Sequence, residues 1–272
     1  MISFIITTFQ RDTLLYKSLE SLLKYIQPNW NIIVVDQGNL TSEKEAWLDK
    51  NKFDSLNYSR HNDEQKLFYY QVPFNSGLSY GRNFGVQKAK ELGSEFCVIG
   101  SDSFLFNNTI ERLKYIERIF DEHGCDKIGF ELTGCKCRWE AELNLIEGET
   151  FELNFCENIF PIYRTFHEYV IGLKRVEICR NFFMATTESL LNTQWDNKLK
   201  LGEHEDQAYI YKQKGYWTFW TDFITAEKMT ARPDEYSKYR KENFSNGLVY
   251  LREKYKIKGW VSYKNLDRAK YA

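Results

Sequence analysis

The chain has 272 residues, a formal net charge of −1, 17% aromatic residues and six cysteines. This length is enough for one large α/β domain, alone or with a small appendage, and for a substantial core. The near-neutral charge gives the whole chain no electrostatic basis for nucleic-acid binding. We find no basic segment before the first apolar run and no apolar stretch of membrane-spanning length, so we expect a cytoplasmic protein with reduced thiols. Cys135 and Cys137 are the closest cysteine pair, and a single CxC is a weak metal signal.

The first 38 residues predict a βαβ unit. Residues 2–7 and 31–36 are continuous apolar runs, and residues 14–25 between them have amphipathic spacing. Open α/β sheets bind ligands at the carboxyl ends of their strands, so we expect Thr7, Thr8, Arg11 and Asp36 to meet there. No glycine-rich phosphate loop follows the first strand, which disfavours Rossmann dehydrogenases and P-loop proteins.

The rest of the chain continues the alternation of strands and helices. In the first half of the chain we further expect a helix at 42–51, strands at 68–72 and 95–100, helices at 82–91 and 108–123, and a strand at 127–131. Strand-like segments follow at 150–154 and 168–178, residues 180–186 form either a strand or a close backbone approach, and a helix could begin at 188–191. The last expected elements are a helix that opens at 202–207 and reaches about 214, a strand at 215–220 and a charged helix at 234–255. Residues 232–272 contain 11 Lys and Arg against 5 Asp and Glu. This basic segment is either a solvated helical tail or a surface for an anionic acceptor, a membrane or nucleic acid.

Two single carboxylates follow buried strands. Asp36 could accept a hydrogen bond from a nucleobase N–H or a ribose hydroxyl, or it could serve as an ordinary turn or N-cap residue. Asp102 could hold a divalent cation beside a diphosphate, or it could be a turn residue between Ser101 and Ser103.

A cluster of acids and an arginine offer further chemistry. Glu203, Glu205 and Asp206 lie at an expected helix start, where acids are tolerated and where one could act as a general base. Arg82 and Asn83 follow a glycine-rich turn, and Arg82 could bind a diphosphate with its bidentate fork or lie solvated in a first helical turn.

Over residues 1–225 these features resemble the family 2 glycosyltransferases with the GT-A fold. The matching segments are the strand at 2–7 with Thr8-Phe-Gln-Arg11, Val34-Val35-Asp36-Gln37-Gly38, Asn75-Ser-Gly-Leu-Ser-Tyr-Gly-Arg-Asn-Phe-Gly85 and Gly202-Glu-His-Glu-Asp206. Ser103-Phe-Leu-Phe106 and Arg180-Asn-Phe-Phe-Met-Ala185 are similar to the β-1,4-N-acetylgalactosaminyltransferase branch.

The resemblance implies an α/β fold of GT-A type, with a Rossmann-like, mostly parallel central sheet flanked by helices and a C-terminal helical extension. It implies a GT-A domain at 1–231, with a nucleotide-binding half at 1–105 and an acceptor half at 106–231, followed by the basic extension at 232–272. It also implies a nucleotide-sugar site formed by Thr7, Thr8, Arg11, Asp36, Asn75, Gly77, Arg82, Asn83, Ser101 and Asp102, and a base at Asp206 or, second, at Glu205.

The sequence departs from the family at the metal motif. The resemblance implies Mn²⁺ or Mg²⁺ at Asp102, but the usual neighbouring aspartates are Ser101 and Ser103 here. Either Asp222 or Glu227 replaces the absent ligands, or arginine and lysine neutralise the diphosphate instead.

The leading hypothesis is an inverting transfer of a sugar from a UDP-type donor to a hydroxyl. The acceptor could be a glycan, a lipid-linked sugar, a small molecule or modified DNA. A degenerate, non-catalytic protein that binds nucleotide sugars is the first alternative, because the metal motif is incomplete. A sugar nucleotidyltransferase is the second, although the loop after the first strand supplies only Arg11 as a basic residue.

Overall fold

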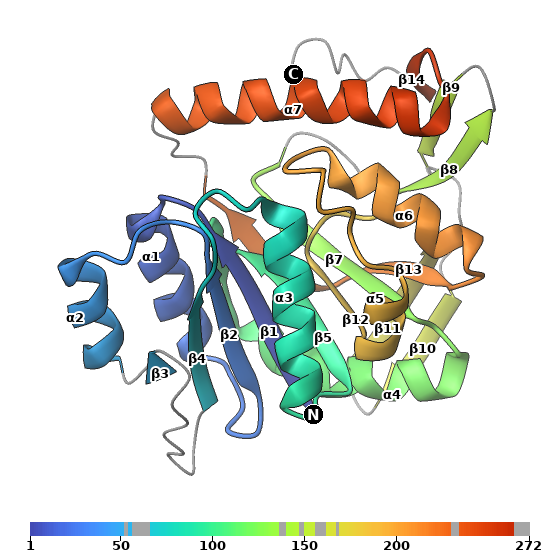
Figure 1. The fold of residues 1–272 in the computed structure, drawn as a ribbon. Helices are drawn as coiled ribbons and strands as arrows, with labels where there is room; N and C mark the ends of the chain where they lie inside the picture. Colours follow the sequence, from blue (N-terminus) through green and yellow to red (C-terminus); the bar gives the residue numbers. More distant parts are fainter. Residues whose placement is uncertain are drawn as a thin grey trace.

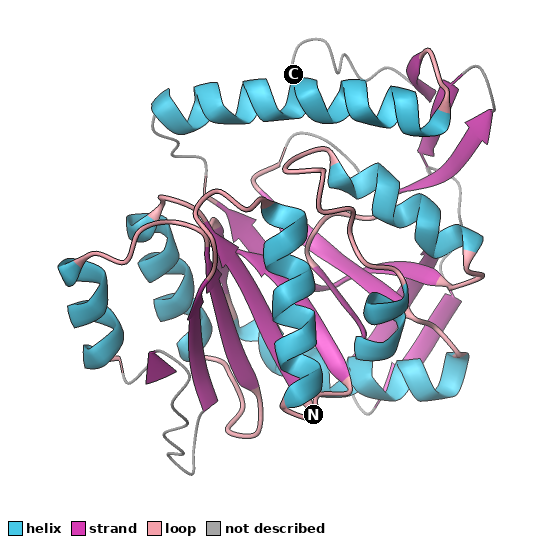
Figure 2. Cartoon of the chain, in the orientation of Figure 1, coloured by secondary structure: helices cyan, strands magenta, loops and turns pink. Residues whose placement is uncertain are grey.

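The computed structural model describes residues 1–51, 54–55, 66–135, 140–146, 150–155, 162–166, 169–229 and 234–263. Cys137 and the expected domain boundary after residue 231 lie outside these residues. The described chain forms a large sheet in the order β10-β11-β13-β7-β12-β5-β1-β2-β4-β3, with β6 paired to β13, and a second sheet in the order β14-β9-β8. Helices cover both faces of the large sheet (Figure 1, Figure 2).

The amino-terminal part of the large sheet is entirely parallel. Its strands are β1 (Ile2–Thr8), β2 (Asn31–Asp36), β3 (Asp54–Ser55), β4 (Lys66–Gln71) and β5 (Phe96–Ser101). In β1, Thr7 pairs with Ser101 and Thr8 pairs with Asp36. The expected βαβ unit is therefore present, and the polar ends of β1, β2 and β5 meet at one edge.

Beyond β5 the sheet becomes mixed. The strands are β7 (Lys127–Thr133), β10 (Ile162–Phe166), β11 (Tyr169–Val176), β12 (Phe183–Thr186) and β13 (Thr218–Lys228), with β6 (Phe104–Phe106) at the side of β13. Only β7 and β13 pair in parallel here. The second sheet contains β8 (Ala141–Ile146), β9 (Thr150–Phe155) and β14 (Gly259–Tyr263).

Two apolar cores lie on opposite faces of the large sheet. One core contains residues of α1 (Asp12–Leu23), α2 (Ser42–Lys50), the 3₁₀ turn η1 (Asn108–Arg112) and α4 (Leu113–His123). The other contains residues of α3 (Leu78–Glu91), α5 (Thr187–Asn192) and α6 (Glu203–Gln213). This division follows from strands that are apolar on both faces.

Helix α3 lies unusually close to the sheet because of a glycine. A Cβ on Gly85 would lie 2.5 Å from Ile5 Cγ2, which is too close for any larger residue. The close approach brings the first turn of α3, with Arg82, to the carboxyl edge of β1. The packing of α3 against β1 thus explains why a glycine stands at position 85.

Helix α7 (Asp234–Tyr255) lies across the carboxyl edge of the sheet, over α3 and α6 (Figure 1). Gly247 allows the close contact, because a Cβ there would lie 2.3 Å from the Leu201 carbonyl oxygen. The helix has the bounds expected from the sequence, and between residues 237 and 255 only Gly247 and Leu251 are buried among the residues whose burial is described. Among the described helices, none is both long and apolar enough to cross a membrane.

Candidate active site

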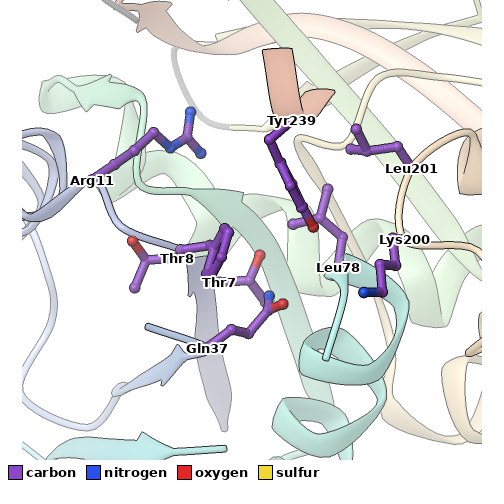
Figure 3. A pocket seen from close by; sticks show the side chains of 9 residues that line it. Thr7, Thr8, Arg11, Gln37, Leu78, Lys200, Leu201 and Tyr239 are labelled. Carbon is purple, nitrogen blue, oxygen red and sulfur yellow. The ribbon is translucent and has the colours of Figure 1, made fainter. Parts of the chain in front are cut away.

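Two adjoining cavities open at the carboxyl edge of the sheet. The small cavity, of about 10 Å³, is lined by Thr7, Thr8, Phe9, Arg11, Gln37, Leu78, Lys200, Leu201 and Tyr239 (Figure 3). The large cavity, of about 200 Å³, shares Thr7, Arg11, Leu78 and Leu201 with it and extends to α6 and α7. Thr7, Thr8 and Arg11, expected together from the sequence, do meet here, whereas Asp36 lines neither cavity.

Asp36 is fully buried, and its oxygens are used inside the protein. Oδ1 accepts a hydrogen bond from the Gly38 amide at 2.7 Å, while Oδ2 accepts from Lys44 Nζ at 2.6 Å and from the Tyr69 hydroxyl at 2.7 Å. Lys44 is only 1% exposed, so this is a buried ion pair. Asp36 lines neither cavity, and its expected contact with a nucleoside stays a prediction.

Asp102 is also fully buried, and Arg11 holds it. Thr8 Oγ1 donates to Oδ2 at 2.8 Å and Arg11 Nε donates to the same oxygen at 3.0 Å. Arg11 Nη2 and Ser101 Oγ donate to Oδ1. Burial raises the pKa of Asp102, and the Arg11 charge is the strongest of the influences that oppose this rise.

These contacts do not fit a divalent cation. A carboxylate has about four lone-pair sites, and four donors already occupy those of Asp102. Hard cations prefer several oxygen ligands, yet the described residues contain no group of three or more His, Cys, Asp or Glu that could hold a metal. Asp222 and Glu227, the suggested substitutes, are exposed and line neither cavity. The metal predicted at Asp102 is not supported by this geometry.

Two residues of the glycine-rich turn, Asn75 and Gly77, line neither cavity but bind side chains that line the small one. Gly77 has a φ of 96° and donates its amide to Gln37 Oε1 at 2.6 Å. Asn75 Oδ1 accepts a hydrogen bond from the Tyr239 hydroxyl at 2.7 Å. Asn83 instead binds the backbone of Trp195 at 2.8 and 3.0 Å, so it attaches α3 to a loop. Asn83 lines neither cavity, and its expected contact with the nucleotide sugar stays a prediction.

Arg82 reaches the large cavity already paired with an acid. Its Nη1 lies 2.5 Å from Glu203 Oε1, and both side chains are nearly buried. Burial alone would raise the pKa of Glu203, but Arg82 and His204 outweigh it and lower this pKa to about 2. A carboxylate so strongly committed to its charged form is a weak base.

Asn181 and His204 complete this polar wall. Asn181 Nδ2 donates to Glu203 Oε1 at 2.9 Å and lies 2.6 Å from His204 Nε2. Burial lowers the pKa of His204 to about 4, with Arg82, Lys228 and Arg240 acting in the same direction. The imidazole is therefore neutral near pH 7.

The acid that was expected first as the base is directed away from the cavity. Asp206 is fully buried, and its Oδ1 accepts hydrogen bonds from Lys254 Nζ and the Tyr255 hydroxyl, each at 2.7 Å. It lines neither cavity, whereas Glu205 lines the large one and is 5% exposed. In this arrangement the end of α7 binds Asp206, and Glu205, the second of the two expected bases, is the one that lines the cavity.

Several site residues lay outside the sequence-based expectations. The large cavity also contains Arg180, Lys228, Arg240 and Phe244, and the small one contains Gln37, Lys200 and Tyr239. Tyr239 points from α7 into the space between Thr7, Gln37 and Lys200 (Figure 3). The excess of Lys and Arg in residues 232–272 was the one sequence feature that could have indicated Arg240 as a site residue, but it is also typical of a solvated surface.

The comparisons with known proteins agree with this architecture. Residues 3–123 match the model of glycosyl transferase family 2. No curated protein matches the chain in sequence. The solved structure of S. aureus TarS superimposes with a TM-score of 0.56 and 18% identity over 84% of this chain and 60% of that one. The structure of S. aureus TarS in complex with UDP-GlcNAc has a TM-score of 0.60 and 15% sequence identity, over 92% of this chain and 66% of that one. The structure of GalNAc-T7 with UDP, GalNAc and Mn²⁺ has a TM-score of 0.60 and 13% sequence identity, over 85% of this chain and 43% of that one.

The parallel amino-terminal half of the sheet and the mixed second half correspond to the GT-A fold. The model of glycosyl transferase family 2 matches the part of the chain that runs from β1 to α4. The resemblance to the galactosaminyltransferase branch is only loosely supported, because GalNAc-T7 shares the fold at low identity. The chain spans about 60% of the first TarS structure.

Proposed function

We propose that this protein transfers a sugar from a UDP-type nucleotide sugar to an acceptor hydroxyl, with inversion at the anomeric carbon. The observation that carries the proposal is the large cavity, in which Glu205 lies among five cationic residues at the carboxyl edge of the sheet. A negatively charged leaving group and a proton-accepting carboxylate are the two needs of such a transfer. TarS, which has the same fold, has been solved with UDP-GlcNAc and with UDP.

The two cavities suit the two ends of the donor. The small cavity, at the ends of β1 and β2, would hold the nucleoside once Tyr239 gives way. The diphosphate would lie near Arg11, which lines both cavities, and the sugar would enter the large cavity. This order follows from the connected line of nucleoside, diphosphate and sugar in the donor itself.

Glu205 would remove the proton from the acceptor hydroxyl as its oxygen attacks the anomeric carbon. The new C–O bond forms on one face while the bond to the diphosphate oxygen breaks on the other, and the bonding electrons leave with UDP. Glu203 is unsuited to this role because its pKa is lowered to about 2 and Arg82 holds it. His204 has a pKa of about 4, so Glu205 is the base that we favour.

The acceptor class stays open among glycans, lipid-linked sugars, small molecules and modified DNA. Contact with a membrane or nucleic acid through the basic C-terminal segment gains little support, because Arg240 lines the cavity and Lys254 pairs with Asp196 and Asp206. A cytoplasmic location stays a prediction.

The test combines binding and turnover. Nucleotide sugars with different bases and sugars are examined for stabilisation of the folded protein, since a ligand of the native state raises its apparent stability. UDP release is then measured with each stabilising donor, alone and with simple hydroxyl acceptors, and the anomeric configuration of the product is read by NMR. Stabilisation by UDP-sugars without any UDP release would favour the non-catalytic alternative, and retention of configuration would contradict the inverting step.

A further inference from the structure

Arg11 pairs with Asp102, the residue at which the sequence predicted a metal ion. Building on the proposed function, we infer that Arg11, oriented by Asp102, supplies the positive charge that stabilises the leaving diphosphate, so that donor binding and transfer proceed without a divalent cation. In this assignment Arg11 is a catalytic residue and Asp102 is its positioning residue.

The first support is the complete use of the Asp102 carboxylate. Arg11 contacts both of its oxygens, through Nε and Nη2, while Thr8 and Ser101 each donate to one of them. A two-pronged contact of this kind fixes the plane of the guanidinium as well as its charge. A cation could bind Asp102 only by displacing Arg11 from a fully buried carboxylate.

The second support is the chemistry of the neighbouring residues. Ser101 and Ser103 stand on either side of Asp102, and their hydroxyl oxygens lie 3.1 Å apart, within hydrogen-bonding distance. Hydroxyls suit a buried carboxylate that is already neutralised by an arginine, whereas a hard dication needs more negative oxygen ligands. The two serines lack the negative charge that would bind a dication, and Arg11 supplies the positive charge that the dication would have brought.

The third support is the place of Arg11 between the cavities. It is one of four residues that line both, so a diphosphate joining nucleoside and sugar would pass beside it. The large cavity adds Arg82, Arg180, Lys228 and Arg240, against the carboxylates of Glu203 and Glu205. Arg180 also lies 3.8 Å from both Glu131 and Glu140, so this support rests on the place of Arg11 between the cavities and not on a net positive charge.

The chemical step is balanced without a metal. When the bond between the anomeric carbon and the diphosphate oxygen breaks, the electron pair stays on that oxygen, and the arginine charge stabilises it. A guanidinium keeps its proton at all ordinary pH values, so its charge needs no cofactor and no proton transfer.

The first experiment uses the unmodified protein. UDP affinity by calorimetry and UDP release from the donor are measured after removal of metals with EDTA, and again with added Mn²⁺ or Mg²⁺. We expect changes of less than about threefold in both quantities. A loss of UDP affinity in EDTA that Mn²⁺ restores would overturn the inference while leaving the proposed function intact. Failure to bind any nucleotide or to release UDP in every condition would instead overturn the proposed function, and this inference with it.

The second experiment changes the residue itself. Arg11→Ala should weaken UDP binding in EDTA and reduce turnover by about a hundredfold, the lower range for loss of one preorganised electrostatic group. Because Mg²⁺-type ions can bind through one or two carboxylates and substrate phosphates, the exposed Asp102 should make UDP binding by Arg11→Ala respond to Mn²⁺.

Two further variants separate this role from folding and from general charge. Arg240→Ala removes another cavity cation and should weaken UDP binding without creating a response to Mn²⁺. In Arg11→Ala/Asp102→Asn the response to Mn²⁺ should disappear, and thermal unfolding of each variant reports its folded state. Equal responses to Mn²⁺ in Arg11→Ala and in the double variant, or unchanged UDP affinity in Arg11→Ala, would refute the assignment.

Discussion

The nucleotide side of the site and its acceptor side use charge differently. On the nucleotide side, Asp36 and Asp102 are fully buried and each is paired with a cation, Lys44 and Arg11 respectively. On the acceptor side, Glu203 and Glu205 line the open cavity, and only Asp206 is withdrawn, by α7. The difference teaches that the cation or helix paired with each carboxylate, and not only its position at the end of a strand, decides whether it faces the cavity.

The largest expected effect tests the acceptor side. Glu205→Gln should reduce turnover by about a hundredfold or more, the usual contribution of a positioned general base, while UDP affinity and thermal stability stay close to those of the parent. The amide keeps the size of the side chain but cannot accept the acceptor's proton. Steady-state UDP release and calorimetry are the measurements.

Asp206→Asn is the matched control for Glu205→Gln, since the two acids are neighbours on α6. It should keep near-parental turnover but lose about 1–3 kcal/mol of unfolding free energy, because it weakens hydrogen bonds to Lys254 and Tyr255. An inactive Asp206→Asn beside an active Glu205→Gln would reverse the assignment and restore the expectation from the sequence.

The next effect tests whether Asp36 is structural. Asp36→Ala should lower the unfolding free energy by about 3–5 kcal/mol, because it leaves Lys44 buried without its carboxylate partner. Urea unfolding measures this loss. The isosteric Asp36→Asn should cost less, and a fully stable Asp36→Ala with weakened UDP binding would show that Asp36 is a nucleotide ligand after all.

A smaller effect is expected where α7 meets the nucleotide side. Tyr239 occupies the small cavity, leaving room for roughly one water molecule. If its ring must leave before the nucleoside enters, Tyr239→Ala should raise UDP affinity by about tenfold, since a ligand that binds a minor conformation gains when that conformation becomes dominant. Tyr250→Phe, which removes a hydroxyl from the same helix, is the control in calorimetry. Weaker UDP binding by Tyr239→Ala would mean that the ring stacks on the base.

The smallest effect concerns pH. His204 has a pKa of about 4 in the folded protein, below its usual value of about 6.5, so the unfolded chain binds a proton first as the pH falls. Stability should decline between about pH 6.5 and pH 4 from this group, and further toward pH 2 from Glu203, whose pKa is lowered to about 2. Urea unfolding of His204→Asn should lack the upper part of this decline. A parent whose stability is constant from pH 6.5 to 4.5 would contradict the assignment.

Much of the fold could be predicted from local patterns. The strand at 31–36 and the charged helix at 234–255 have the expected bounds, because an apolar run and a long charged segment without proline or internal breaks need little tertiary information. Helix α3 begins at Leu78, earlier than the expected 82, since Gly77 with its positive φ ends the loop there. The strand β13 extends to Lys228, well beyond the expected 220, because pairing with β6 and β7 continues it.

The amino-acid sequence by itself determined that Thr7, Thr8, Arg11 and Asp102 lie at one edge of a parallel sheet, because strand direction places successive polar ends together. Only the tertiary structure decided what each group binds. Arg11 reaches Asp102 across 91 residues, and Lys254 reaches Asp206 across 48. Such pairings depend on the distance and direction of side chains from separate elements, which hydrophobic periodicity does not encode. The position of α7 over the site was decided in the same way, through the contact of Gly247 with Leu201.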